Sequence, residues 1–98
     1  MGEIRITLET LYDILRNEKK RDDLQKLDPA FFKDVVDYVL EKEALLKRQQ
    51  ESSDVFARAE QEKLEYELKS IKRILREIYE KREKKVIDIS VNNTIIDG

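Results

Sequence analysis

Between residues 3 and 97 the chain contains no glycine and a single proline, Pro29. Glycine and proline are the residues that most often end helices and build turns, so little interrupts this sequence. Ala, Glu, Lys, Leu and Arg make up 48 of the 98 residues, close to the half that is typical of long helices and coiled coils. A chain of this length forms one domain with a modest core. We therefore expect a mainly α-helical single domain.

The first predicted helix begins after Thr7, whose hydroxyl suits an N-cap. Apolar residues follow at offsets of three, four and seven, which places them on one face of a helix. They are Leu8, Leu11, Tyr12 and Leu15. The charged run at residues 18–23 breaks this stripe, so we expect a solvated helix end or loop there.

The second predicted helix begins at Asp28 and Pro29, the pattern of an N-cap followed by a proline in the first turn. A wide apolar face then runs from Phe32 to Leu40, and its aromatic residues are expected to belong to the core. Nothing stops this helix before about Gln50. We expect the two shorter helices to pack their apolar faces mainly against each other.

A longer helix is predicted from Ser53 or Asp54 to Lys85. Its apolar residues alternate at spacings of four and three, the heptad pattern of a helix–helix seam. At 1.5 Å per residue it would be about 48 Å long, more than two shorter helices can cover. We therefore predict self-association of the isolated chain and a subunit interface along the seam. The interface residues are Leu64, Leu68, Ile71, Leu75, Ile78 and Tyr79.

After Lys85 the apolar period changes from 3.6 to 2. Residues 86–91 read VIDISV, which predicts a short strand, and Asn92 and Asn93 predict a turn. Residues 94–96 are a candidate second strand. The predicted fold is thus a helical bundle of two shorter helices and one long helix over residues 1–85, followed by a short β-strand or hairpin within residues 86–98.

Catalytic chemistry finds little support in the sequence. The chain has no cysteine and no histidine, which removes thiol nucleophiles, the usual zinc ligands and the imidazole base. Its two glycines, at positions 2 and 98, cannot form a phosphate-binding loop. Carboxylate pairs such as Asp34 with Asp37 fall on helix faces expected to be solvated. We expect no enzyme activity, no cofactor and no metal.

Charge is unevenly distributed although the net charge is only −2. Residues 69–85 hold eight basic and three acidic side chains. The candidate basic patch consists of Lys69, Lys72, Arg73, Arg76, Arg82 and Lys85. It would suit phosphates or an acidic partner. Alternatively, these cations complement the helix dipole or pair with nearby glutamates, so we expect DNA contact to be weak or indirect.

No apolar run approaches the roughly 20 residues of a membrane span, and no signal-peptide pattern opens the chain. We expect an intracellular protein, located in the cytoplasm or nucleoid of an archaeon or in the nucleus of a eukaryote, with no membrane partner.

Two blocks of the sequence resemble the helical domain of the GINS subunits of the replicative helicase. Residues 24–43 read LQKLDPAFFKDVVDYVLEKE, and residues 71–87 read IKRILREIYEKREKKVI. The order and spacing of the blocks carry the resemblance more than either block alone, and it covers about residues 8–90. The chain is most similar to the archaeal subunit type that places its helical domain first and a small β domain last.

This resemblance implies that residues 1–85 form the helical domain, that a short strand and the start of a linker follow, and that the small β domain lies outside this chain. It implies a non-catalytic scaffold subunit in DNA replication that links the MCM helicase to its RecJ-like nuclease partner, with primase as a further candidate. The family's subunits assemble through their helical domains into a four-chain complex, so a companion GINS subunit is an expected partner.

Two other functions remain open. The chain is alternatively a homo-oligomeric coiled-coil module with no role in replication, or a small nucleic-acid-binding helical domain that uses the basic patch.

Overall fold

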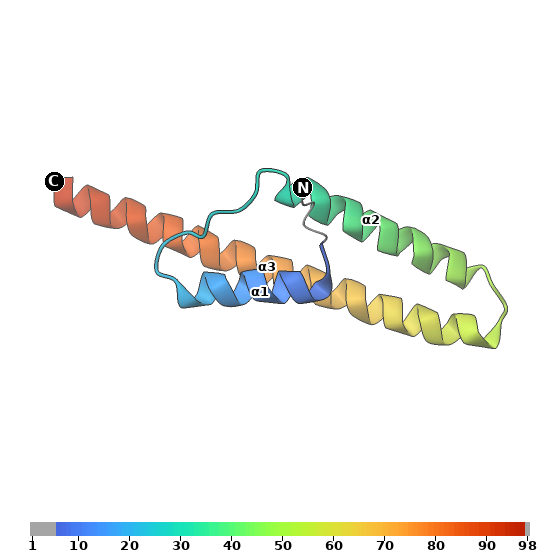
Figure 1. Ribbon diagram of the computed structural model, residues 1–98. Coiled ribbons are helices and arrows are strands. Elements are labelled where there is room, and N and C mark those ends of the chain that lie inside the picture. The colour runs from blue at the N-terminus through green and yellow to red at the C-terminus, as the bar shows by residue number, and fades with distance from the viewer. Residues whose placement is uncertain (1–5, 98) are drawn as a thin grey trace.

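The computed structural model describes residues 6–97, and side chains within residues 6–93. Three helices follow one another along the chain: α1 (Leu8–Lys20), α2 (Phe31–Gln50) and α3 (Val55–Asp97). The molecule is elongated, 65 × 29 × 19 Å, because α3 runs its whole length (Figure 1). The predicted mainly α-helical bundle of two shorter helices and one long helix is confirmed.

Helix α1 begins with a reciprocal cap in which Thr7 is the N-cap residue, as the sequence predicted. The Thr7 hydroxyl accepts a hydrogen bond from the Thr10 backbone N–H at 3.1 Å, and the Thr7 N–H donates to the Thr10 hydroxyl at 2.7 Å. Both backbone donors would otherwise be unpaired at the start of a helix. The cap therefore fixes the start of α1 at Leu8, two residues after the buried Ile6.

Aspartates stand before the other two helices. The Asp54 carboxylate accepts a hydrogen bond from the Phe56 N–H at 3.1 Å, so it caps α3 as predicted. The Asp28 carboxylate accepts from the Ala30 N–H at 2.8 Å, but residues 29–30 form a turn and α2 begins only at Phe31. The start of α2 thus lies later than the Asp28–Pro29 pattern predicted, whereas its end at Gln50 agrees with the prediction.

The predicted strand at residues 86–91 is wrong, because α3 continues through these residues to Asp97. No strand occurs anywhere in residues 6–97. A helix satisfies its backbone hydrogen bonds within its own segment, whereas a lone strand needs a second strand beside it. Residues 86–97 contain no glycine or proline to stop the helix, and their β-branched residues cost only a few tenths of a kcal/mol each in helix propensity.

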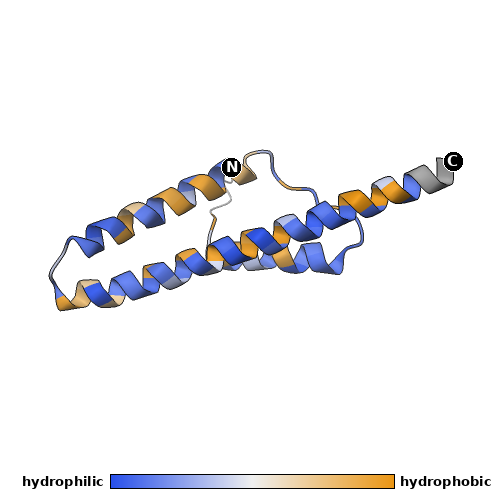
Figure 2. Cartoon of the chain, turned by 180° about the vertical axis from the view of Figure 1, so that it is seen from behind, coloured by the Kyte–Doolittle hydropathy of each residue, from blue (hydrophilic) through white to orange (hydrophobic). Residues whose placement is uncertain are grey.

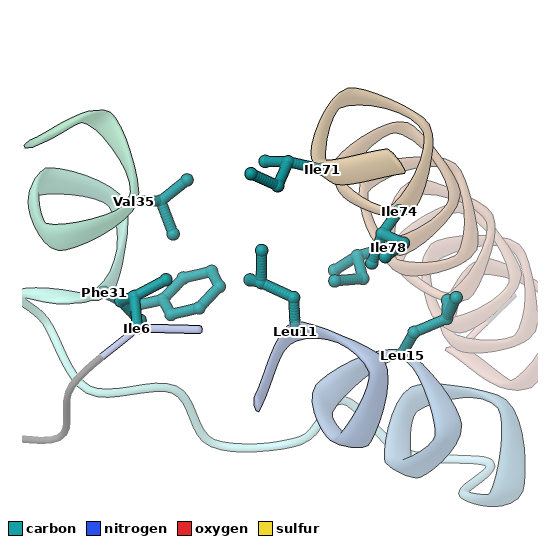
Figure 3. Close-up of a cluster of buried hydrophobic side chains, with 8 residues drawn as sticks. All are labelled: Ile6, Leu11, Leu15, Phe31, Val35, Ile71, Ile74 and Ile78. Atoms are coloured by element: carbon teal, nitrogen blue, oxygen red, sulfur yellow. The ribbon is translucent and has the colours of Figure 1, made fainter. Parts of the chain in front are cut away.

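Both shorter helices pack against α3. No backbone contact joins α1 to α2 within the described part of the chain, so the expectation that they pack mainly on each other is wrong. Side chains from all three helices meet in one core (Figure 3). Its buried members are Ile6, Leu11, Leu15, Phe31, Val35, Ile71, Ile74 and Ile78. Helix α3 is therefore the common support of the fold.

Among residues 6–97, no helix is both long enough and apolar enough to cross a membrane.

Candidate functional site: a buried ion cluster beside an exposed apolar groove

Most of the predicted subunit interface is buried inside the monomer. The buried members are Leu64, Leu68, Ile71 and Ile78. Leu75 is half-buried against the core, and only Tyr79 is well exposed, at 65%. The prediction left part of the seam to be covered by the two shorter helices, and α1 and α2 both lie on α3 and cover most of it. Of the six predicted interface residues, only Leu75 and Tyr79 remain accessible to a partner.

The predicted basic patch is divided by the fold. Four of its members are exposed on the outer face of α3: Lys69, Lys72, Arg73 and Arg76. Arg73 also donates a hydrogen bond from Nη2 to the Tyr12 hydroxyl at 3.1 Å. The other two members point into the bundle toward α1: Arg82 is half-buried and Lys85 is buried. The six residues therefore do not form one continuous surface.

Arg82 and Lys85 meet a fully buried carboxylate, Glu18, near the end of α1. Glu18 Oε1 accepts hydrogen bonds from Arg82 Nη1 at 2.7 Å and from Gln25 Nε2 at 2.8 Å. Glu18 Oε2 accepts from Lys85 Nζ at 2.6 Å. We call these four residues the ion cluster. Its charges are paired at short distance, which is the condition under which charges are tolerated away from water.

The ion cluster also holds the connection between α1 and α2. Lys85 Nζ donates to the backbone carbonyls of Glu18, at 2.6 Å, and Asp23, at 2.9 Å. Arg82 Nη1 donates to the Gln25 carbonyl at 3.0 Å, and Gln25 Nε2 donates to the Ile14 carbonyl at 2.7 Å. Residues 18–25 are thereby fastened to α3 along both their side chains and their backbone.

Two opposing effects set the pKa of Glu18. Burial raises it, but hydrogen bonds from Lys85, Gln25 and Arg82 to the charged form outweigh burial and lower the pKa from 4.5 to about 2. At neutral pH the carboxylate is ionised and is a poor proton acceptor. The cluster is suited to fixing the helices in place rather than to proton transfer.

The sequence contained a signal for this cluster that the prediction did not use. Lys85 follows Ile71 and Ile78 at the same spacing of seven, and Arg82 follows Leu75 by seven. On α1, Glu18 lies seven residues after Leu11. Charged residues in register with an apolar seam indicate buried partners, because the heptad positions face the neighbouring helix.

An apolar groove lies beside the ion cluster, between α2 and α3, with a volume of about 600 Å³. Its exposed lining residues are Phe32 and Val36 of α2 and Tyr79 and Val86 of α3, with Leu24 and Leu75 less exposed. Arg82 and Glu83 are its only charged lining residues within the described structure. Figure 2 shows apolar residues recurring along α2 and along the C-terminal part of α3. Monomers seldom leave a contiguous apolar surface open unless it binds something.

The end of α3 projects past the bundle (Figure 1). We call residues 86–93 the projecting end. Four of its apolar residues are between 43% and 53% exposed: Val86, Ile87, Ile89 and Val91. Neither α1 nor α2 reaches far enough along α3 to cover them. The groove and the projecting end together form a second apolar region outside the core.

In comparisons with known proteins, no family model matches this chain, and neither a curated protein nor a solved structure matches it. Within residues 6–97, no group of three or more acidic side chains is placed to hold a metal ion.

Proposed function

We propose that the chain is a non-catalytic helical scaffold that binds other proteins through the apolar groove, and that it serves as a GINS-like subunit in DNA replication. The observation that carries the proposal is the apolar surface left open beside a core that is already filled. Tyr79 and Phe32 are 65% and 64% exposed although neighbouring Ile78 and Phe31 are almost fully buried. Folding of the monomer does not require the exposed pair, so a protein partner is the best explanation for them.

A scaffold must present its binding surface on a fixed frame, and this chain has one. The groove is formed by α2 and α3, which Lys42 of α2 and Glu67 of α3 join by an ion pair at 3.0 Å. Beside the groove, the ion cluster holds residues 18–25 against α3. A preorganised surface loses less conformational entropy on binding and therefore binds more tightly.

The replication role is supported by the resemblance of residues 24–43 and 71–87 to GINS helical domains. Residues of both blocks line the groove, Phe32 from the first and Tyr79 from the second. The helical state of residues 86–97 departs from the short strand that the resemblance implied. On this proposal the partners are a companion GINS subunit, the MCM helicase and a RecJ-like nuclease, with primase as a further candidate.

The test is affinity capture by the purified chain from an extract of its source cells, followed by mass spectrometry. We expect recovery of the MCM helicase and of a second GINS-like subunit. Tyr79→Glu should abolish both, whereas Tyr66→Glu, which changes a tyrosine of similar exposure on the same helix, should recover them normally. Good recovery of the bait with neither partner would contradict the replication role.

A further inference from the structure

We infer that the groove binds the projecting end of α3 from a second copy of the chain, so that two copies exchange these ends about a two-fold axis. The inference rests on the proposed role of the groove as a protein-binding surface, and it names one occupant.

The projecting end lacks cover on two sides. Val86 and Ile89 are three residues apart and share one side of the helix, whereas Ile87 and Val91 are four apart and share a different side. A helix that is apolar on more than one side is stable in water only when neighbours bury it. Within residues 6–93, the monomer leaves these four side chains about half exposed. Each copy therefore presents both an open groove and an uncovered helix.

The two features are continuous, since Val86 both lines the groove and begins the projecting end. A second α3 lying antiparallel along the groove would place its own groove over the first copy's projecting end. One contact thus covers the groove and the Val86–Ile89 side of the projecting end in both copies. Such a self-complementary, closed contact is the commonest form of protein dimer.

The charged residues of the groove fit this arrangement. Arg82 and Glu83 are consecutive and opposite in sign, and no other charged residue of the described structure lines the groove. An antiparallel pair with its axis between these positions places Glu83 of each copy near Arg82 of the other, while Arg82 Nη1 stays bound to Glu18 of its own copy. The same register places Tyr79 of each copy beside Val86 of the other. A parallel pair would instead oppose like charges, which disfavours it.

Sedimentation of the full 98-residue chain over a wide concentration range tests the inference. We expect a monomer–dimer equilibrium whose dissociation constant rises about tenfold or more in Val86→Asp and in Ile89→Asp, because each buries a charge within the contact. Tyr66→Asp adds the same charge to an exposed apolar position outside the groove and should leave the constant unchanged. Circular dichroism should show equal helix content in all four proteins.

Cross-linking tests the register independently, because the chain has no cysteine of its own. Glu83→Cys should form a disulfide-linked dimer on mild oxidation, since position 83 lies beside the proposed axis. Glu65→Cys, also exposed on α3 but outside the groove, should form no disulfide-linked dimer under the same conditions.

A wild-type chain that stays strictly monomeric at high micromolar concentration would overturn the inference. So would a dimer that the two aspartate variants do not weaken and that the Glu83→Cys variant does not cross-link. A monomer that still recovers the replication partners would leave the proposed function standing. Conversely, a dimer of the expected register that recovers none of them would remove the replication role alone.

Discussion

The ammonium nitrogen of Lys85 lies 2.6 Å from Oε2 of Glu18, although 67 residues separate the two in sequence. The Glu18 side chain is fully buried, and Lys85 is only 7% exposed. This contact joins the end of α1 to the point where α3 leaves the bundle. Glu18 and Lys85 are charged residues of the kind usually found on the surface, yet their contact fixes the position of α1 along α3.

Glu18→Gln should destabilise the fold by about 3 kcal/mol, because it leaves the Lys85 and Arg82 cations without their carboxylate in a buried site. Urea unfolding followed by circular dichroism measures the loss. Asp13→Asn is the matched control, since Asp13 pairs with Arg16 on the exposed face of α1 and should matter by less than about 0.5 kcal/mol. Equal losses in the two variants would show that the ion cluster is not a structural determinant.

Stability should depend on acid through the same carboxylate. Glu18 has a pKa of about 2 when folded and an ordinary value of 4.5 when exposed to water. Since the folded value is the lower one, the ionised carboxylate adds stability that is complete above about pH 5 and is lost as the pH falls through 4.5 toward 2. The difference in unfolding free energy between the wild type and Glu18→Gln should therefore narrow over this interval. Urea titrations at stepped pH measure it, and a constant difference would contradict the assignment.

Ile71→Ala should cost about 3 kcal/mol, because the side chain is fully buried where all three helices meet and its removal leaves a cavity. Tyr66→Ala, on the same helix but 67% exposed, should change the unfolding free energy by less than about 1 kcal/mol. Thermal and urea unfolding of both variants provide the comparison. A small effect at Ile71 would mean that α1 and α2 do not pack on α3 as described.

DNA binding should be weak and strongly dependent on salt. Three of the four exposed basic residues of α3 lie four residues from a glutamate: Lys69 from Glu65, Arg73 from Glu77 and Arg76 from Glu80. Arg82 and Lys85 are paired with Glu18, so few counterions can be released. We expect a dissociation constant for duplex DNA weaker than about 1 µM near physiological salt. Fluorescence anisotropy measures it. A tighter constant that is lost in a Lys69→Ala, Lys72→Ala, Arg76→Ala triple variant would favour the nucleic-acid-binding alternative.

Local signals in the sequence predicted much of the fold. Thr7 and Asp54 mark helix starts because their side chains satisfy backbone donors only a few residues away. The alternation of residues 86–91 misled the prediction for the same local reason. A period of two describes a strand only where a second strand is present, and that depends on the rest of the chain.

The candidate site was harder to predict because it depends on distant contacts. Arg82 and Lys85 resemble any other cation of a charged helix, and only their register with Leu75 and Ile78 sets them apart. Tyr79 continues the apolar pattern of the seam, yet it lies outside the core. Its exposure follows from where α2 sits on α3, which no short stretch of sequence specifies.

The order of the helices along the chain has a consequence for synthesis. A ribosome releases α1 and α2 first, and neither has a surface to pack on until residues 71–85 of α3 have emerged. Until then the nascent chain must carry two amphipathic helices with their apolar faces uncovered. Chaperones that hold short apolar segments would meet this protein before it folds, and a message broken ahead of the Ile71 codon would yield a product that lacks the part of the core supplied by α3.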